Sequence, residues 1–391
     1  MGAWRPLRFR GALVAVVAVA LSLPVAAYGG STWTIDRTPS DGGFSQLAAV
    51  SCVSVRWCAA VGYSSGLPRF DAIAEIWNGS RWTITSIPVY EGHLFDVSCV
   101  AASWCAAAGY KLMGDDGTAT FIAVWNGHAW RQVPSPDPGS LNNILYGVSC
   151  VSRSSCLAVG TFGANSFHLL TERWDGHAWK VVSVSAVDRA AAALAVSCVA
   201  TNACFAVGDA NDGPVALRWD GHTWSSSKMP TRGLSRDNLL TDLSCPSTTT
   251  CVAVGASGPG VSGYGNNPRE QTLVETWNGK RWRIIPSPNR TDYVSVLSGV
   301  SCISAEQCTA VGRDVNVQGG KSRTLIEIWD GRSWRLVSTP NRPTGTSDGY
   351  LYMHGSALYG VSCVASACTA AGLYQDTRHT DTVQTLVEAR R

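Results

Sequence analysis

Charge is scarce in this chain, and the charges that are present nearly cancel. Only 15% of the 391 residues are charged, and 31 Lys and Arg face 28 Asp and Glu, which leaves a formal net charge of +3. Nucleic acids and anionic membrane surfaces attract proteins with a large excess of basic residues. We therefore expect no nucleic-acid partner.

A long hydrophobic run is also missing beyond the first residues. A membrane-spanning helix needs about 18 consecutive apolar residues. Residues 1–27 instead combine an Arg-rich start, a shorter apolar run over 11–23 and small residues ending at Ala27, which is the layout of a signal peptide. Cleavage there would remove three arginines and no acidic residue, leaving a neutral mature chain of residues 28–391. We expect an exported protein, extracellular or in the cell envelope, with no membrane span; an uncleaved N-terminal anchor is the alternative.

Cysteine, in contrast, is plentiful and regularly placed. Six pairs enclose five residues each and the last encloses four, a pattern that in an exported chain predicts one disulfide within each pair. Zinc sites use closer pairs, so we expect no metal and no cofactor. The pairs are Cys52 and Cys58, Cys99 and Cys105, Cys150 and Cys156, Cys198 and Cys204, Cys245 and Cys251, Cys302 and Cys308, and Cys363 and Cys368.

The cysteine pairs mark an internal repeat. Their first members are 47, 51, 48, 47, 57 and 61 residues apart, a period typical of propeller blades. Each unit begins with an apolar strand ending in Ser-Cys and returns as Cys-x-Ala-Val-Gly or a close variant. A cystine between two antiparallel strands suits the short Cα separation of a non-hydrogen-bonded pair.

Tryptophan marks the second half of six units. In each, Trp precedes Asn-Gly or Asp-Gly and a second Trp follows three residues after the Gly, as from Trp77 to Trp82. Asn-Gly and Asp-Gly between strand-like runs predict a two-residue type I′ turn. With that turn Glu75 would face Trp82, where the carboxylate would accept a hydrogen bond from the indole nitrogen.

Seven units of four strands, with no helical period, predict an all-β protein folded as a seven-bladed β-propeller of four antiparallel strands per blade. The alternative, an open solenoid, would need capping repeats. The expected blades are residues 44–88, 92–136, 143–183, 191–230, 237–288, 295–340, and 356–391 together with 31–39.

The last blade takes a strand from each end of the chain. Residues 385–391 align with a third strand and nothing follows them, whereas residues 31–39 match the fourth strand that begins at Trp82 in the first blade. The N-terminal strand is therefore predicted to complete the last blade and close the ring, which removes an open sheet edge.

The Ser-Cys-x5-Cys-x-Ala-Val-Gly and Trp-Asn/Asp-Gly-x-x-Trp motifs resemble those of a family of exported bacterial repeat proteins, common in actinobacteria and taken to be β-propellers. The resemblance covers nearly all of residues 31–391 and implies the fold without implying an activity. The turn from Asp220 to Trp224 is more distantly similar to the Asp-box turns of sialidase propellers, but it departs from them because its Asp and Gly are adjacent and a leading Ser or Thr is missing.

The two faces of such a propeller would differ. The cystine turns and Trp turns, all short and alike, would lie on one face, and the long dissimilar loops, such as 313–323 and 338–357, on the other. Variable loops on a rigid scaffold usually carry binding, so we expect a ligand on the long-loop face. The candidate ligand-binding residues are Tyr350, Tyr352, His354, Tyr293, Arg313 and Arg323.

These patterns predict a monomeric, secreted or cell-surface binding module for a glycan or protein ligand. The alternative is a carbohydrate-active enzyme, a glycoside hydrolase or lyase, which would use paired carboxylates. Asp96 and Asp242 are the only acidic residues three positions before a first cysteine, but they belong to blades two and five and would stand far apart. We assign no catalytic residue; a purely structural envelope protein without a pocket is the third hypothesis.

Overall fold

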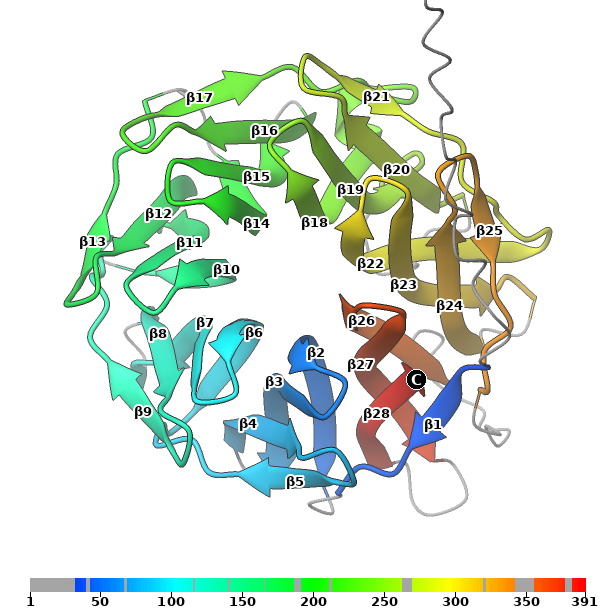
Figure 1. Cartoon of the computed structure of the whole chain (residues 1–391). Coiled ribbons are helices and arrows are strands. Elements are labelled where there is room, and N and C mark those ends of the chain that lie inside the picture. Colours follow the sequence, from blue (N-terminus) through cyan, green and yellow to red (C-terminus); the bar gives the residue numbers. More distant parts are fainter. Residues whose placement is uncertain are drawn as a thin grey trace, which may run out of the picture. The chain divides into compact units, whose positions relative to one another are not determined.

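The computed structural model describes residues 32–39, 43–66, 69–114, 117–139, 141–164, 166–185, 191–210, 213–261, 269–318, 321–341, 355–376 and 382–391. These residues form seven four-stranded antiparallel sheets arranged around a central axis (Figure 1). The prediction of a seven-bladed β-propeller is confirmed.

The strands follow one another from the axis outward in each of the first six blades. Blade 1 contains β2 (Phe44–Ser54), β3 (Trp57–Gly66), β4 (Arg69–Trp77) and β5 (Trp82–Thr85); blade 2 contains β6 (Gly92–Ala101), β7 (Trp104–Leu112), β8 (Thr118–Trp125) and β9 (Trp130–Val133); blade 3 contains β10 (Ile144–Ser152), β11 (Ser155–Phe162), β12 (His168–Trp174) and β13 (Trp179–Val181). Blade 4 contains β14 (Ala191–Ala200), β15 (Ala203–Ala210), β16 (Gly213–Trp219) and β17 (Trp224–Ser227); blade 5 contains β18 (Asn238–Ser247), β19 (Thr250–Ser257), β20 (Gln271–Trp277) and β21 (Trp282–Ile284), preceded by the 3-10 turn η2 (Ser235–Asp237); blade 6 contains β22 (Tyr293–Ser304), β23 (Gln307–Asn316), β24 (Ser322–Trp329) and β25 (Trp334–Leu336). Blade 7 contains β26 (Ser356–Val364), β27 (Ala367–Asp376), β28 (Thr382–Arg390) and, from the other end of the chain, β1 (Thr34–Asp36).

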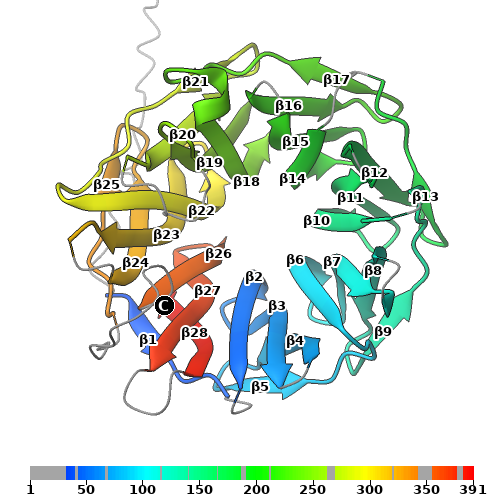
Figure 2. The ribbon, with the colours of Figure 1, turned by 180° about the vertical axis from the view of Figure 1, so that it is seen from behind.

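The apolar core lies between neighbouring blades. The innermost strands surround the axis and the fourth strands form the outer rim, as both faces of the disc show (Figures 1 and 2). Five residues before its first cysteine, six of the seven innermost strands bury a leucine completely, and β14 buries Ala193 there. The leucines are Leu47, Leu94, Leu145, Leu240, Leu297 and Leu358.

The N-terminal strand closes the ring, as predicted. Strand β1 pairs antiparallel with β28, with Thr34 opposite Ala389. Trp33 is only 4% exposed and packs in a core cluster with Leu386 and other residues of blades 6 and 7. Arg391 adds an ion pair with Asp36, its Nη2 lying 2.6 Å from Oδ2.

All seven predicted disulfides are present, one in each blade, and the described residues include no free cysteine. Each joins the first two strands of its blade, with Cα atoms 4.0 to 4.1 Å apart. The close approach is that of directly opposite residues in an antiparallel pair, as at Cys52 and Cys58.

A ring of hydrogen bonds connects the innermost strands. The serine before each first cysteine accepts a hydrogen bond from the backbone N–H of the first cysteine in the next blade, at 2.9 to 3.0 Å. The series closes on itself when Cys52 donates to Ser362. The sevenfold repetition of this serine therefore has a structural cause. The other six acceptors are Ser51, Ser98, Ser149, Ser197, Ser244 and Ser301.

The Trp turns differ from the prediction. Trp77 lies directly opposite Trp82, so four residues form the turn, and Gly79 has a positive φ of 92° whereas Asn78 does not. The side chain of Asn78 shapes the turn, because its Oδ1 accepts hydrogen bonds from the backbone N–H groups of Ser80 and Arg81. The type I′ prediction is therefore wrong. An aspartate oxygen accepts equally well, as at Asp175, which explains why Asn and Asp alternate at this position.

The second tryptophan of a blade reaches the preceding blade. The indole Nε1 of Trp82 donates to Asp36, that of Trp130 donates to Thr85, and that of Trp282 donates to Ser227. In these three cases the acceptor stands three residues after the second tryptophan of the preceding blade, whereas Trp224 donates to Thr171 of β12. Where that position holds Val133, Ile285 or Val337, the indole nitrogens of Trp179, Trp334 and Trp33 have no hydrogen-bond partner in the described part of the chain.

Candidate functional site

The structure describes three of the six candidate residues proposed from the sequence. Tyr350, Tyr352 and His354 lie outside the described residues. Tyr293 and Arg323 do lie together in blade 6, with the guanidinium carbon of Arg323 4.1 Å from the centre of the Tyr293 ring. On β23, Asp314 lies directly opposite Arg323, and Arg313 is its neighbour along the strand. Adjacent strand residues face opposite sides of a sheet, so Arg313 lies on the other side from Arg323.

A larger feature occupies the long-loop ends of blades 1 to 3. Seven aromatic rings, which we call the aromatic row, are in continuous contact there. The central ring, His93, stacks on Tyr63 with a centroid distance of 4.2 Å and on Tyr110 at 4.9 Å. The contacts continue from Tyr110 through Phe95 to Tyr146 at 5.7 and 5.3 Å. The seven members are Phe44, Tyr63, Phe70, His93, Phe95, Tyr110 and Tyr146.

A bulge places two of these rings. In each innermost strand the register shifts four residues before the first cysteine, a position held by Phe95 in blade 2 and Tyr146 in blade 3. A bulge redirects the side chain of the extra residue. The aromatic row therefore follows the inner strands from one blade to the next.

Six apolar side chains at the same end of blades 1 to 3 are 36% to 66% exposed, and we call them the apolar surface; Phe70 also belongs to the aromatic row. They lie on the loops and strand ends of the same face of blades 1 to 3, and hydrogen bonds hold their backbone: Leu112 donates to Glu91 O at 2.8 Å, and Gly163 donates to Leu141 O at 3.2 Å. The surface is thus a fixed feature of the fold. Its members are Phe70, Tyr90, Leu112, Met113, Leu141 and Phe167.

The aromatic row carries no charge at neutral pH. Burial lowers the pKa of His93 below its ordinary value, because desolvation disfavours the imidazolium. Burial also raises the pKa of Tyr110, which keeps its hydroxyl protonated. A charged ligand would find no ionic partner within the row, and an apolar or aromatic group would find rings to pack on.

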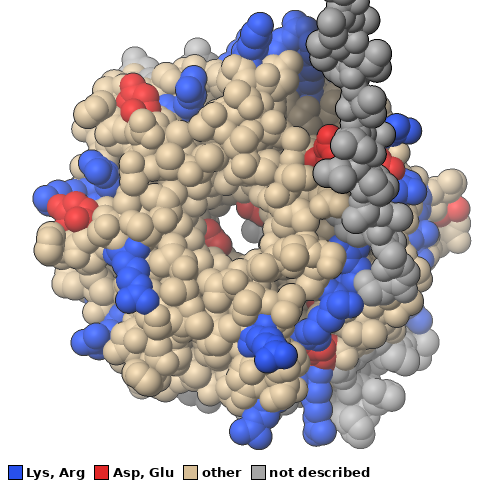
Figure 3. All heavy atoms as spheres, in the orientation of Figure 1, with Lys and Arg blue, Asp and Glu red and all other residues tan. Residues whose placement is uncertain are grey.

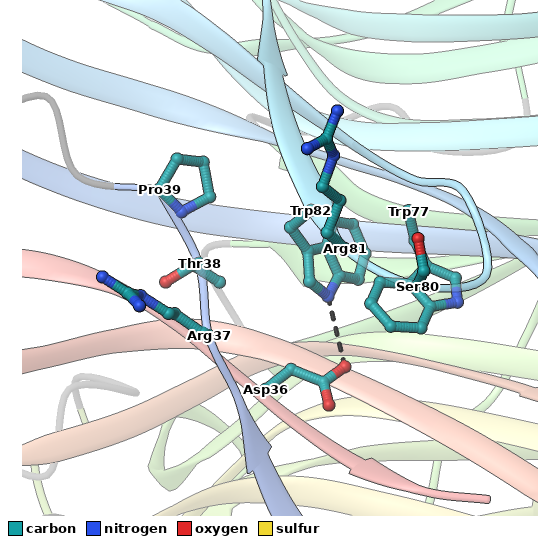
Figure 4. A pocket seen from close by; sticks show the side chains of 8 residues that line it. All are labelled: Asp36, Arg37, Thr38, Pro39, Trp77, Ser80, Arg81 and Trp82. Carbon is teal, nitrogen blue, oxygen red and sulfur yellow. Dashed lines mark hydrogen bonds between the residues drawn. The ribbon is translucent and has the colours of Figure 1, made fainter.

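The described residues also line hollows outside the row. One, of about 430 Å³, lies beside it in blade 2 and is lined by Lys111, Thr120, Gln132, Pro134, Ser135 and Asp137. Another, of about 400 Å³, lies at the junction of blades 7 and 1, where β1 meets the Trp turn of blade 1 (Figure 4). There Trp82 donates to Asp36, and the Arg391 guanidinium covers the Trp77 ring at 4.1 Å. These contacts join the two blades.

The channel on the axis is open, and acidic atoms are visible in its wall (Figure 3). Asp96 and Asp242 are the only acidic residues on the innermost strands. Asp96 accepts hydrogen bonds at 2.8 Å from the N–H groups of Val97 and, in the next blade, Val148. Asp242 makes the equivalent bonds at 2.7 Å to Leu243 and Val300. Each carboxylate thus joins two blades.

Burial shifts the titration of both channel carboxyls. Desolvation raises the pKa of Asp96 and of Asp242 to about 7 each, and the charge of Asp242 contributes at Asp96. The two backbone amides on each group oppose that shift. Each carboxyl therefore holds backbone amides of two neighbouring blades, which supports a structural role for the pair.

The glutamates before the first tryptophan are buried completely. Glu172 accepts a hydrogen bond from Ser135 at 2.7 Å, and Glu327 accepts one from Ser287 at 2.7 Å, each from the preceding blade. The expected bond to an indole nitrogen is therefore wrong for these two. Glu275 has no hydrogen-bond partner in the described part of the chain, because Met229 holds the position of Ser135 and Ser287.

Replacing Glu275 should change how stability depends on pH. Burial raises its pKa from 4.5 to about 8, so the folded protein keeps a proton that the unfolded chain loses above about pH 4.5. Stability therefore falls as the pH rises from 4.5 to 8. We expect Glu275→Gln to raise the free energy of unfolding by ~2–4 kcal/mol at pH 8 and to change it little at pH 5.

Urea titrations at the two pH values would measure this effect. The exposed Glu306 provides a control, since Glu306→Gln should leave the wild-type pH dependence intact. An equal gain at pH 5 and pH 8 would contradict the assignment of the effect to ionisation.

No helix among the described residues is long and apolar enough to cross a membrane. The sequence matches no protein-family model and no curated protein.

Solved structures are similar in fold. The chain is similar to YCF48 bound to D1 peptide, with a TM-score of 0.56 and 12% identity over 94% of this chain and 100% of that one. It is also similar to YCF48 from Cyanidioschyzon merolae (TM-score 0.52, 13% identity, 92% and 99% covered). A third similar structure is a polysaccharide lyase of family PL25, an ulvan lyase bound to -[GlcA(1-4)Rha3S]- (TM-score 0.54, 10% identity, 89% and 95% covered). At these identities the likeness shows the propeller fold alone.

Proposed function

We propose that this protein is an exported binding module that takes a polypeptide partner on the apolar surface of blades 1 to 3. The observation that carries the proposal is the group of six exposed apolar side chains at the long-loop ends of blades 1 to 3. Isolated exposed apolar residues are ordinary, but a gathered group of them indicates an interaction site. Tyr, Phe and Met are enriched at protein interfaces, and charged residues are depleted at their centres.

Two further observations support the proposal. Cystines persist in oxidising compartments, so seven of them favour export, for which we propose residues 1–27 as the signal peptide. Of the similar propellers, one is described as bound to a peptide and another as a lyase bound to a saccharide. The peptide parallel is the one that fits an apolar surface.

Selection from a random-peptide library on the immobilised mature protein tests the function. We expect enrichment of peptides rich in apolar residues. The double variant Phe70→Ser and Met113→Ser should weaken their binding about tenfold or more, because a few apolar anchors supply most of the binding free energy of an interface. Val55, which is 48% exposed on the short-turn face, provides the matched control, and Val55→Ser should bind as wild type does.

The selection has outcomes that would overturn the proposal. An equal loss in the Val55 variant would place binding elsewhere, and the absence of any enriched peptide would count against a polypeptide ligand. A glycan array is the parallel experiment. If no peptide is enriched but a glycan binds the wild type and not the Phe70 variant, the ligand is a carbohydrate.

A further inference from the structure

One buried carboxylate in blade 6 holds two arginines. The side chain of Asp314, on β23, is 1% exposed, and its Oδ2 receives hydrogen bonds from Arg290 Nε at 3.0 Å and Arg323 Nε at 3.4 Å. Its Oδ1 accepts from Ser295 at 2.7 Å. The Arg323 guanidinium also lies over the ring of Tyr293. The two guanidinium groups are therefore fixed in place.

Both arginines keep unused donors. Asp314 contacts each guanidinium through Nε, and the Nη atoms of both have no hydrogen-bond partner among the described residues. Their side chains are 38% and 33% exposed, so solvent reaches them. Arg presents its donors in a planar fork that matches an oxyanion.

The charge at this end of blade 6 is not balanced. From residue 290 to residue 323, Arg290, Lys321 and Arg323 stand against Asp292 and Asp314 on the long-loop side, without Arg313 on the other side of β23, so one positive charge is in excess. Burial, together with the charge of nearby Asp314, raises the pKa of Glu327 to about 8. Glu327 is therefore neutral at pH 7. A bound anion would complete this cluster.

The cluster is specific to blade 6. The residue two positions after the repeated glycine is Asp314 here, whereas the other blades hold different side chains at that position. A part of the blade scaffold would recur, as the serine ring does, and this cluster does not. The other residues are Ser64, Lys111, Phe162, Ala210, Ser257 and Tyr374.

We propose that Arg290 and Arg323, held by Asp314, form a binding site for an oxyanion, a carboxylate or a sulfate, with the Tyr293 ring as its wall. This site lies in blade 6 and does not rest on the proposed function of blades 1 to 3. The anion is either free in solution or a substituent of a larger ligand, such as a uronic acid.

Calorimetric titration of the mature protein at low salt tests the site. The ligands are sodium sulfate, glucuronate and, as the uncharged control, glucose. We expect saturable binding of sulfate and glucuronate and none of glucose. Arg290→Gln and Arg323→Gln should each weaken binding about tenfold or more, because each removes charged hydrogen bonds. Tighter binding of glucuronate than of sulfate would identify the source as a saccharide, and the reverse a free inorganic anion.

Arg313→Gln is the matched control, since it removes the same charge from the other side of the same strand. We expect it to weaken binding less than twofold. If Arg313→Gln reduces affinity as much as Arg323→Gln, or if wild-type protein binds neither anion, the proposal is wrong. Arg290→Lys and Arg323→Lys keep the charge and should still weaken binding, and melting curves would show that all variants are folded.

Discussion

Deletion of residues 31–39 should lower the free energy of unfolding by more than the Trp33→Ala substitution does. Replacing a buried tryptophan by alanine costs ~3–5 kcal/mol. The deletion removes the Trp33 side chain from its core cluster and the whole β1–β28 pairing. It also leaves β28 as an open edge, and open edges pair with other chains. We therefore expect a lower melting temperature together with aggregation on heating.

Denaturant titration followed by tryptophan fluorescence would measure the loss. Trp33→Ala should account for much of it, whereas Thr32→Ala, at an exposed position, should change stability by less than ~0.5 kcal/mol. A deletion variant with the wild-type unfolding midpoint would show that the N-terminal strand does not close the ring.

Reduction of the seven cystines should have the largest effect of all. In the chain-entropy model each bridge of this loop size contributes ~2–2.5 kcal/mol, and the contributions need not add. The second cysteine of each pair is buried, as Cys105 is, so the bridges must be reduced in denaturant. We expect protein reduced and alkylated in this way not to regain the native fluorescence on dilution.

A single-blade variant sets the scale of that effect. Replacing Cys99 and Cys105 together by alanine should lower the free energy of unfolding by ~2 kcal/mol. Peptide mapping of the oxidised protein should find only bridges within blades. Cross-blade pairs, or full refolding of the alkylated chain, would contradict the role assigned to the bridges.

The fold could be predicted because its pattern is repeated seven times along the chain. The cysteine spacing revealed the blade period, and the match between residues 31–39 and the strand beginning at Trp82 predicted the closure found between β1 and β28. The turn type could not be predicted, because Asn-Gly suits both a two-residue turn and the four-residue turn in which the Asn78 side chain accepts two backbone N–H groups.

The aromatic row could not be predicted from the same repeats. Its members stand at different offsets from the motifs: Tyr63 and Tyr110 follow the repeated glycine, whereas His93 and Phe95 precede a cysteine. Only the packing of adjacent blades and the bulge at Phe95 bring them into contact. A comparison of residues at equivalent positions of neighbouring blades could have found Tyr63 and Tyr110, which hold the same place in blades 1 and 2.

The contacts from one blade to the next also affect how each blade comes to pack against its correct neighbours during folding. Blades of similar structure in one chain can dock on the wrong neighbour while the protein folds. In blades 3 and 6 a buried glutamate meets a serine hydroxyl of the preceding blade, as Glu172 meets Ser135, whereas blade 4 has Leu217 at this position and the preceding blade offers Val184. A wrong neighbour would leave a buried carboxyl against an aliphatic group, at a free-energy penalty of ~1–3 kcal/mol. Small differences between similar blades thus favour the native packing of neighbours over other arrangements of the same blades.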